Sequence, residues 1–274
     1  MSTSVSSKSF IAPARVARGR STRGAARAVS RARGVVVASA DAKKVVVVGG
    51  SGFVGSRVVE RLGDMGVDVT SVSKSGKGGV AIDLSTDACA DALKDAFTGA
   101  DAVISCVGIF GADDATLRAG NGDYNVRAIE AAKAAGVPRF VLVSVASIVS
   151  DVVGETSLMK GYFEGKSAAE AALRANYPES DSLVVRPSFV YGGDAFSVNP
   201  PRVTQQYGDI LVKLLGSGPI KAIAERSPGP IALTLAEPQS VSDVAAACVA
   251  GAMGANPAPV ADGTDDIKAC AARA

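Results

Sequence analysis

The chain has 274 residues, of which 47% are hydrophobic and 5% aromatic, so it is long enough to bury one sizeable core. It contains no histidine, which excludes Ser-His-Asp hydrolases, histidine-ligated zinc and a histidine general base. The formal net charge of +2 is unevenly distributed, because residues 1–40 hold eight basic residues and no acidic one, which leaves 21 basic against 27 acidic residues in the rest. That acidic excess argues against nucleic-acid binding.

Residues 1–40 are rich in Ser, Ala and Arg, the composition of an organelle-targeting peptide. The Ser-rich start suits a plastid, whereas arginines that recur every three or four residues suit a mitochondrion. We predict a disordered transit peptide that is cleaved near residues 34–40, with a basic tail that contacts RNA or anionic lipid as the alternative. No apolar run reaches the ~20 residues of a membrane span, so we expect a mature protein that is soluble or peripherally attached.

From Lys43 onward, strand-like runs alternate with helical patterns. We predict strands in KVVVVGG, VDVTSVS, GVAIDL, DAVISCVG, RFVLVSV and DSLVVRP, and helices at about 53–65, 86–97, 117–135 and 159–177. This alternation indicates an α/β domain with a doubly wound parallel sheet over residues 43–190. The nearly continuous apolar character of the strands indicates that helices cover both faces of the sheet.

The pattern weakens after Pro187. We predict a small C-terminal substrate lobe and a closing helix over residues 191–256, with one clear lobe helix in DILVKLLG and the closing helix in PQSVSDVAAACVAGAM. In a doubly wound fold such a lobe lies beside the carboxyl ends of the strands, where ligands bind. We expect residues 257–274 to form a flexible tail.

The cysteines give no sign of a disulfide framework or a metal site. Cys89, Cys106, Cys248 and Cys270 form no Cys-x-x-Cys pair, and each lies in an Ala/Val-rich segment. We therefore expect reduced, buried thiols and no bound metal.

Three spaced glycines, Gly49-x-x-Gly52-x-x-Gly55, follow the first strand and open the first helix. Gly49 and Gly50 permit a sharp turn, Gly52 lets a pyrophosphate approach the backbone, and Gly55 lets the helix lie close to the sheet. The phosphates would bind the amides at the helix N-terminus. In this context the motif predicts a dinucleotide-binding Rossmann fold, and a glycine-rich turn without a ligand is the alternative.

The second strand ends in SVSKSGKGG, which offers Ser73, Lys74, Ser75 and Lys77 and no acidic residue. An NAD site usually places Asp or Glu there, whereas hydroxyl and ammonium groups suit the 2′-phosphate of NADP. The sequence therefore favours NADP(H) over NAD(H), and a solvated basic loop is the alternative. Asp83, at the end of the third strand, is a candidate acceptor for the adenine amino group.

The segment GYFEGKSAAEAAL places Tyr162 and Lys166 four residues apart, and so on one face of the predicted helix. A phenol with an ordinary pKa near 10 is a poor acid–base group at neutral pH, and a neighbouring ammonium favours its ionised form. Such a pair can exchange a proton with a carbonyl or an alcohol. An exposed lysine beside a core tyrosine is the alternative.

Several motifs in chain order resemble the extended and atypical short-chain dehydrogenase/reductases over about residues 43–253: GGSGFVG, Asn125 of YNVRAIEAAKAAGVPRF, the Tyr-x-x-x-Lys pair, VVRPSFVYGG and PQSVSDVA. Within that family, TSVSKSGK, GYFEGKSAAEAALRANYP and VVRPSFVYGG look like a group of chloroplast NAD(P)-binding Rossmann proteins of plants. That group is similar to a dehydrogenase-like protein of fungal ubiquinone biosynthesis and to an accessory subunit of respiratory complex I. The resemblance implies a chloroplast location, with peripheral attachment to thylakoids or plastoglobules, and a mitochondrial location is the alternative.

The resemblance also implies residue roles. Tyr162 would be the proton donor or acceptor, Lys166 would hold the nicotinamide ribose and lower the pKa of the tyrosine, and Pro187 would line the nicotinamide end. The nucleotide would contact a larger set of residues at the strand ends and the first helix: Gly49, Ser51, Gly52, Phe53, Val54, Gly55, Ser73, Lys74, Asp83, Leu84, Val107, Gly108, Asn125, Lys166 and Pro187.

One departure from the family concerns the end of the fifth strand, where extended members place a Ser or Thr that binds the substrate oxygen. The segment GVPRFVLVSVAS puts Val145 there, with Ser144 before it and Ser147 two residues beyond, so one of these serines would have to replace the missing group.

Two functions follow from these motifs. The first is an NADPH-dependent oxidoreductase that acts on a carbonyl or quinone-like apolar metabolite, with Tyr162, Lys166 and Ser144 as catalytic residues. The second is a non-catalytic NADPH-binding subunit of a membrane-associated, prenylquinone-type assembly. A sugar-nucleotide epimerase is disfavoured by the small size of the lobe.

Overall fold

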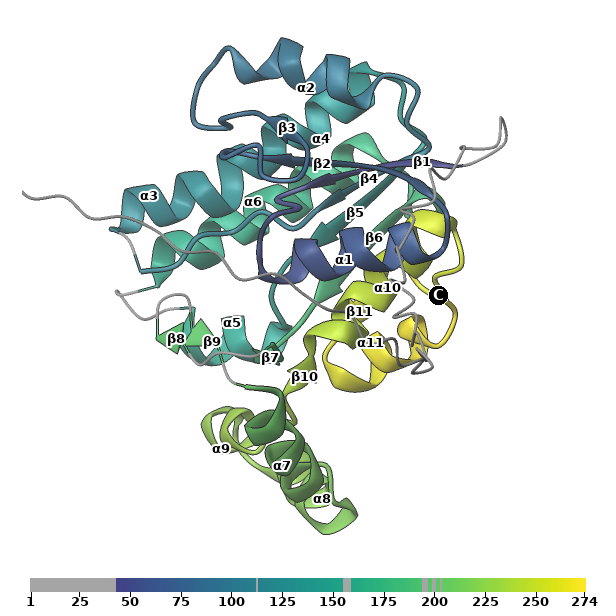
Figure 1. The fold of residues 1–274 in the computed structure, drawn as a ribbon. Coiled ribbons are helices and arrows are strands. Elements are labelled where there is room, and N and C mark those ends of the chain that lie inside the picture. The colour runs from purple at the N-terminus through teal and green to yellow at the C-terminus, as the bar shows by residue number, and fades with distance from the viewer. Residues whose placement is uncertain (1–42, 112, 155–158, 194–196, 199–200, 203) are drawn as a thin grey trace, which may run out of the picture. The chain divides into compact units, whose positions relative to one another are not determined.

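A computed structural model describes residues 43–274 except 112, 155–158, 194–196, 199–200 and 203, so the predicted transit peptide lies outside the described residues. Seven parallel strands form the central sheet in the order β11-β6-β5-β4-β1-β2-β3 (Figure 1). Their bounds are β1 (Lys44–Val48), β2 (Asp68–Ser73), β3 (Val80–Ala81), β4 (Ala102–Ser105), β5 (Arg139–Val143), β6 (Ser182–Arg186) and β11 (Val260–Asp262). The order reverses between β1 and β4, which confirms the predicted doubly wound sheet and places a ligand crevice at the carboxyl ends of these strands.

Helices cover both faces of the sheet. Successive strand residues point to opposite sides, so a strand of apolar residues needs cover on both. In β1, Val46 and Val48 join the core under α2 (Cys89–Phe97), α4 (Tyr124–Ala134) and α6 (Lys160–Asn176). Val45 and Val47 join the core under α1 (Phe53–Asp64), α10 (Val241–Met253) and α11 (Thr264–Ala271) (Figure 1). The strands β1, β4, β5 and β6 are therefore buried on both faces, as their sequences predict.

Shorter elements connect this framework. α3 (Asp114–Arg118) continues through a π-helical turn, η1 (Ala119–Asp123), into α4, so the predicted helix at 117–135 begins earlier and contains a wider turn. The others are α5 (Ser147–Val153), the 3₁₀ turn η2 (Glu179–Asp181) and the strand pairs β7 (Val190–Tyr191) with β10 (Gln239–Ser240) and β8 (Ser197–Val198) with β9 (Pro201–Arg202). In the described residues, no helix is long and apolar enough to cross a bilayer.

The third predicted strand is much shorter than GVAIDL suggests. β3 pairs with β2 through Val80 and Ala81 alone. Ile82 and Leu84 instead join the core beside α2, because they continue as a turn that brings their side chains under that helix.

The lobe contains three helices rather than the single one predicted: α7 (Gln205–Leu215), α8 (Gly218–Arg226) and α9 (Gly229–Thr234). α7 includes the predicted segment DILVKLLG. Both added helices carry a proline in their first turn, where the missing amide hydrogen costs no hydrogen bond.

The prediction of a flexible tail at residues 257–274 is wrong. β11 extends the sheet by pairing with β6, and Ala261 lies beside Val185 in this register. α11 then packs on α10 and buries Ile267 and Cys270 completely. The tail is therefore part of the core, and α10 is not the closing helix.

Candidate functional site

The glycine-rich turn joins β1 to α1 as the motif predicts. Gly49 has a φ of +79°, and the amides of Gly49 and Gly50 both donate to the carbonyl of Val72, at 2.8 and 3.2 Å. A Cβ on Gly55 would collide with the carbonyl oxygen of Gly49, so the start of α1 requires a residue without a side chain there. The turn therefore brings the helix N-terminus close to the end of β1.

The N-terminus of α1 has the features of a phosphate site. Gly52 precedes the helix in an extended conformation, no side chain of the described residues caps the helix, and its first turn holds no acidic residue. The positive end of the helix dipole is therefore not offset by a carboxylate from the first turn of α1 itself, which fits a dinucleotide pyrophosphate. Ser51, in the turn itself, is exposed at this point.

The ends of β2 and β3 bring Ser73, Lys74 and Asp83 together. The Lys74 ammonium lies 2.9 Å from an oxygen of Asp83, and the side chain of Lys74 remains 77% exposed. Asp83 also accepts hydrogen bonds from the amide and the hydroxyl of Ser85, at 3.0 and 2.7 Å. The bond from Lys74 and those from Ser85 lower the pKa of Asp83 to about 2. The carboxylate predicted to bind adenine thus already has partners in the protein.

Two asparagines hold the loop that follows β4. Asn125 accepts a hydrogen bond from the Ser105 hydroxyl at 2.6 Å and donates to the carbonyl of Val107 at 3.4 Å. Asn121, which the sequence analysis missed, donates to the carbonyl of Ile109 at 3.0 Å and accepts from its amide at 3.3 Å. Both side chains are fully buried, so they shape the loop of Val107 and Gly108 from behind. The sequence signal that could have identified Asn121 is its position one helical turn before Asn125.

The helix α6 is held close to η1 by glycine. A Cβ on Gly165 would lie 2.7 Å from the carbonyl oxygen of Arg118 and 2.8 Å from the amide nitrogen of Gly122. This approach directs the face of α6 that carries Tyr162 and Lys166 toward the strand ends.

Lys166 is 5% exposed, and its ammonium donates to the carbonyls of Val107, at 3.1 Å, and Val143, at 3.0 Å. It lies 5.9 Å from the centroid of the Tyr162 ring. The predicted pair is therefore assembled at the carboxyl ends of β4 and β5.

The ionisation of the pair differs from the expectation. Burial lowers the pKa of Lys166 to about 8 and raises the pKa of Tyr162 to about 12. The predicted lowering of the tyrosine pKa by the lysine is absent, because the ammonium is bound to two backbone carbonyls and removal of the phenol from water dominates. The phenol of Tyr162 is therefore protonated at neutral pH.

Neither serine at the end of β5 is available to replace the missing substrate-binding group. The Ser144 hydroxyl donates to Glu170 at 2.6 Å, and the Ser147 hydroxyl donates to Asp262 at 2.5 Å. A hydroxyl has one proton to donate, and each of these serines donates it to a carboxylate rather than to a substrate oxygen. The structure therefore does not support Ser144 as the oxyanion donor. Val145 contributes an apolar wall at the predicted position.

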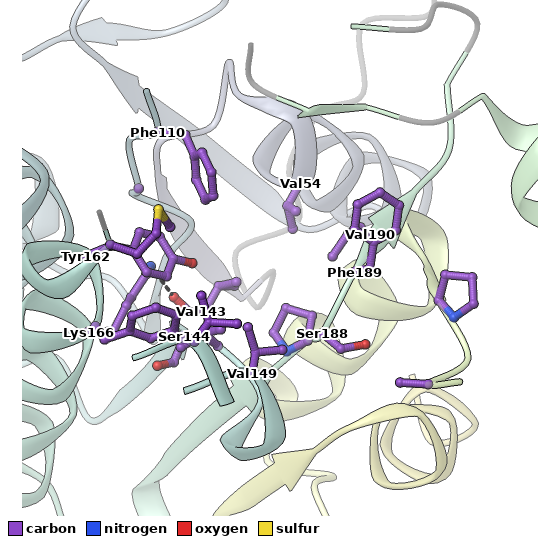
Figure 2. Close-up of a pocket in the computed structure, with 18 of the residues that line it drawn as sticks. Val54, Phe110, Val143, Ser144, Val149, Tyr162, Lys166, Ser188, Phe189 and Val190 are labelled. Carbon is purple, nitrogen blue, oxygen red and sulfur yellow. Dashed lines mark hydrogen bonds between the residues drawn. The ribbon is translucent and has the colours of Figure 1, made fainter. Parts of the chain in front are cut away.

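A cavity of about 830 Å³ opens beside this pair. Figure 2 shows Tyr162 and Lys166 on one side and Phe189 and Val190 on the other. The lobe closes it with Leu211 of α7 and with residues of α9. Of the predicted residues, those that line the cavity are Phe53, Val54, Val107, Gly108, Ser144, Tyr162, Lys166 and Pro187. The other predicted residues do not line it, namely Gly49, Ser51, Gly52, Gly55, Ser73, Lys74, Asp83, Leu84 and Asn125.

The apolar walls of the cavity were not foreseen. They come from short elements far apart in the sequence, including Phe110, Val149, Phe163, Leu215 and Leu233. No spacing in the sequence relates these residues, because the fold alone brings them together.

Comparisons with known proteins agree with this geometry. The chain is 37% identical over 222 residues to an uncharacterised chloroplastic protein of Arabidopsis thaliana, with 78% of this chain and 73% of that protein covered. Its fold is similar to that of UDP-N-acetylglucosamine 4-epimerase from Bacillus cereus, at a TM-score of 0.55 and 16% identity over 82% of this chain and 79% of the epimerase. It is also similar to a short-chain dehydrogenase/reductase superfamily protein from Agrobacterium tumefaciens with bound NAD, at a TM-score of 0.51 and 20% identity over 82% and 80% of the two chains.

The family model described as NAD(P)H-binding matches residues 49–209, from the glycine turn into α7. The matched segment contains the phosphate-binding turn, the basic end of β2 and the Tyr162–Lys166 pair. The chain belongs to the NAD(P)H-binding family.

Proposed function

We propose that this protein is an NADP(H)-dependent oxidoreductase that reduces a carbonyl or quinone-like group of an apolar metabolite. The observation that carries the proposal is the apolar cavity of about 830 Å³ whose wall includes Tyr162 and Lys166. It adjoins a helix N-terminus that fits a pyrophosphate, so a dinucleotide bound there would extend toward the pair.

The protein's own residues suit this chemistry. A bound reduced nicotinamide supplies a hydride. Tyr162, protonated at neutral pH, donates its phenolic proton to the substrate oxygen and is later reprotonated from solvent. Lys166, whose ammonium lies 5.9 Å from the centroid of the Tyr162 ring, would hold the ribose of the bound nucleotide. Pro187 and the lobe exclude water from the reacting atoms.

Two hydroxyl-bearing residues of the described cavity wall are left for the substrate oxygen, Tyr162 and Ser188. Ser144 and Ser147 donate to carboxylates, whereas the buried Ser188 hydroxyl has no hydrogen-bond partner among the described residues. A quinone-like acceptor needs the least from these donors, because its reduction develops a phenolate, with an ordinary pKa of only about 10, rather than the strongly basic alkoxide of a simple ketone.

The Lys74 side chain, which is 77% exposed while its ammonium pairs with Asp83, and the neighbouring Ser73 support a preference for the 2′-phosphate of NADP(H) over NAD(H). The chloroplastic relative and the Arg- and Ser-rich residues 1–40 support a plastid location. Attachment to thylakoids or plastoglobules belongs to the same proposal, since an apolar substrate is concentrated there.

A second candidate function is a non-catalytic NADPH-binding subunit of a membrane-associated assembly. It is favoured by Ser144 and Ser147, because both hydroxyls beside Val145 are bound to carboxylates, and a site without a substrate-oxygen donor at this position is suited to binding rather than turnover.

One set of measurements separates the two candidates. Calorimetry with NADPH and NADH tests binding, and NADPH oxidation is followed with a panel of lipid quinones and aldehydes. We expect NADPH binding and quinone-dependent turnover, lost in Tyr162→Phe and kept in Tyr207→Phe, a control on the exposed surface of α7. Binding without turnover in the wild type would establish the subunit role, and no binding of either nucleotide would refute both.

A further inference from the structure

A cluster of charged side chains lies beneath the cavity, and the proposed chemistry does not use it. Glu170 of α6 is 6% exposed, although carboxylates are rarely buried without a partner. Arg186 ends β6 and Asp262 ends β11, and these two residues are neighbours in the parallel register. Three elements that meet only in the folded protein therefore contribute one cluster.

The guanidinium of Arg186 joins the two carboxylates. Its Nε and Nη2 donate to the two oxygens of Glu170, at 3.0 and 2.5 Å, which is a bidentate pair. Its Nη1 donates to Asp262 and to the Ser147 hydroxyl, both at 3.0 Å. Glu170 also accepts hydrogen bonds from Ser144, at 2.6 Å, and from the half-exposed Arg174 of the same helix, at 3.2 Å. We call Ser144, Ser147, Glu170, Arg186 and Asp262 the clamp.

The clamp connects the parts that form the cavity. Glu170 lies one helical turn after Lys166 and two turns after Tyr162, on the same face of α6. Ser144 and Ser147 flank Val145 on the cavity floor, and Arg186 immediately precedes the lining segment that begins at Pro187. Any tilt of α6 relative to that floor would stretch the bidentate pair.

The charge of Glu170 also acts on Lys166. The groups that face the Lys166 ammonium are Tyr162 and Glu170 from α6, the Cys106 thiol from the end of β4, and the backbone carbonyls after β4 and in β5. Burial lowers the pKa of Lys166, while Cys106 and Glu170 oppose this. Burial also disfavours the charge of Glu170, but hydrogen bonds from Arg186 and Ser144 outweigh it and lower the pKa of Glu170. Glu170 is thus a fixed negative charge.

We propose that Glu170 is a positioning residue of the site: through Arg186 it fixes the helix that carries Tyr162 and Lys166 against the cavity floor, and its negative charge stabilises the Lys166 ammonium. This rests on the proposed function, which gives the Tyr162–Lys166 pair its chemical role. The clamp itself can be tested without nucleotide.

The first experiment titrates Lys166 directly by NMR of protein labelled with ¹³C at the lysine ε-carbon, with the signal assigned through Lys166→Arg. In Glu170→Gln the midpoint of Lys166 should fall by roughly one pH unit, the order of magnitude for loss of a neighbouring opposite charge. In Glu170→Asp, which keeps the charge, it should return close to the wild-type value. Glu164→Gln is the matched control, since this α6 carboxylate pairs on the surface with Arg118. An unchanged midpoint in folded Glu170→Gln would overturn the proposal.

A second variant covers the case in which Glu170→Gln fails to fold because Arg186 is left buried without its partner. Glu170→Gln combined with Arg186→Met removes both charges, so its Lys166 midpoint is compared with that of Arg186→Met alone, which isolates the Glu170 charge. The midpoint should be lower in the double variant, and equal midpoints in these two proteins also refute the proposal.

Nucleotide binding separates this inference from the proposed function. The NADPH affinity of Glu170→Gln should decline at a lower pH than that of the wild type, because Lys166 loses its proton earlier. If the wild type binds no nucleotide while Glu170→Gln still shows the lowered Lys166 midpoint, the proposed function is refuted and the inference about the clamp stands.

Discussion

At the scale of single residues, Lys166 is an ammonium held where water scarcely reaches. Burial lowers its pKa from 10.5 to about 8 in the folded protein. Between these two values the unfolded chain binds more protons than the folded one, so the free energy of unfolding rises with pH in this window. Below pH 8 the cost of burying the charge is fully present. The site therefore reduces the stability of the fold at neutral pH.

Replacement of this lysine by methionine isolates that cost. Between pH 7 and pH 10.5, the unfolding free energy of the wild type should rise relative to that of Lys166→Met by up to roughly 3 kcal/mol. Urea unfolding at a series of pH values measures this difference. Lys160→Met, at a 63% exposed side chain on the same helix, should give a difference that is independent of pH. If the difference in unfolding free energy between the wild type and Lys166→Met did not change with pH, the burial of the Lys166 charge would be contradicted.

Lys74 decides between the two nucleotides in our proposal. Lys74→Ala should weaken NADPH binding about tenfold or more, the value of a charge-assisted hydrogen bond, and leave NADH binding within about twofold. Calorimetry with both nucleotides measures the two affinities, with Lys94→Ala of the exposed face of α2 as the control. Equal losses for both nucleotides would assign Lys74 a role outside phosphate recognition.

The sequence is most informative for residues whose roles depend on local spacing. The glycine turn and the four-residue separation of Tyr162 and Lys166 are local, and the structure places all of them at the crevice. The partner of Ser144 is different, because Glu170 is held in place by Arg186 and Asp262 from strands that meet only in the folded sheet. No spacing within one segment encodes that meeting.

At the scale of elements, the contact between α6 and η1 determines where the Tyr162–Lys166 face points. Gly165→Ala should cost about 1–3 kcal/mol of stability, since its methyl group would press on the backbone of Arg118 and Gly122. Thermal unfolding measures the loss.

The control for this substitution lies on another helix. A methyl group added to Gly63 of α1 would meet only open space, so Gly63→Ala should be neutral or stabilising by up to about 1 kcal/mol. If both alanines had the same effect, the loss at Gly165 would reflect general helix propensity rather than the close approach.

The elements that the sequence analysis missed are short or begin with residues that usually interrupt helices. In α8 and α9, Pro219 and Pro230 indicate breaks when read alone, yet each lies in the first turn of a helix. β11 spans three residues, too few for an alternating pattern to emerge, whereas β3 keeps only two of the residues of the strand predicted in GVAIDL. In contrast, the long central strands and α6 are periodic enough to be located directly.

At the scale of the whole described fold, its last segment closes both the sheet and the clamp. β11 covers the edge of β6, and Asp262 at its end binds Arg186. A chain truncated after Asn256 should therefore fail to unfold cooperatively, as followed by circular dichroism.

A point substitution tests the same claim more gently. Ile267→Ala should cost about 2–5 kcal/mol, because Ile267 of α11 is fully buried in the core. Ile231→Ala removes the same atoms at a residue that is 51% exposed on α9, and should change stability by less than about 0.5 kcal/mol. An equally small effect of Ile267→Ala would instead support the sequence prediction that residues 257–274 form a flexible tail.

The lobe meets the rest of the fold at several places: α9 packs on α5, Lys221 of α8 pairs with Asp265 of α11, and β7 pairs with β10 where the chain enters and leaves the lobe. β7 and β10 run side by side there, with Val190 beside Gln239 and Tyr191 beside Ser240, so the chain leaves and re-enters at one place. Two cuts, one after β7 and one before β10, would therefore exchange the whole lobe for that of a relative. Such chimeras would have a new outer wall of the cavity and would keep the glycine turn and the Tyr162–Lys166 pair unchanged. Natural diversification and protein engineering can both use this route.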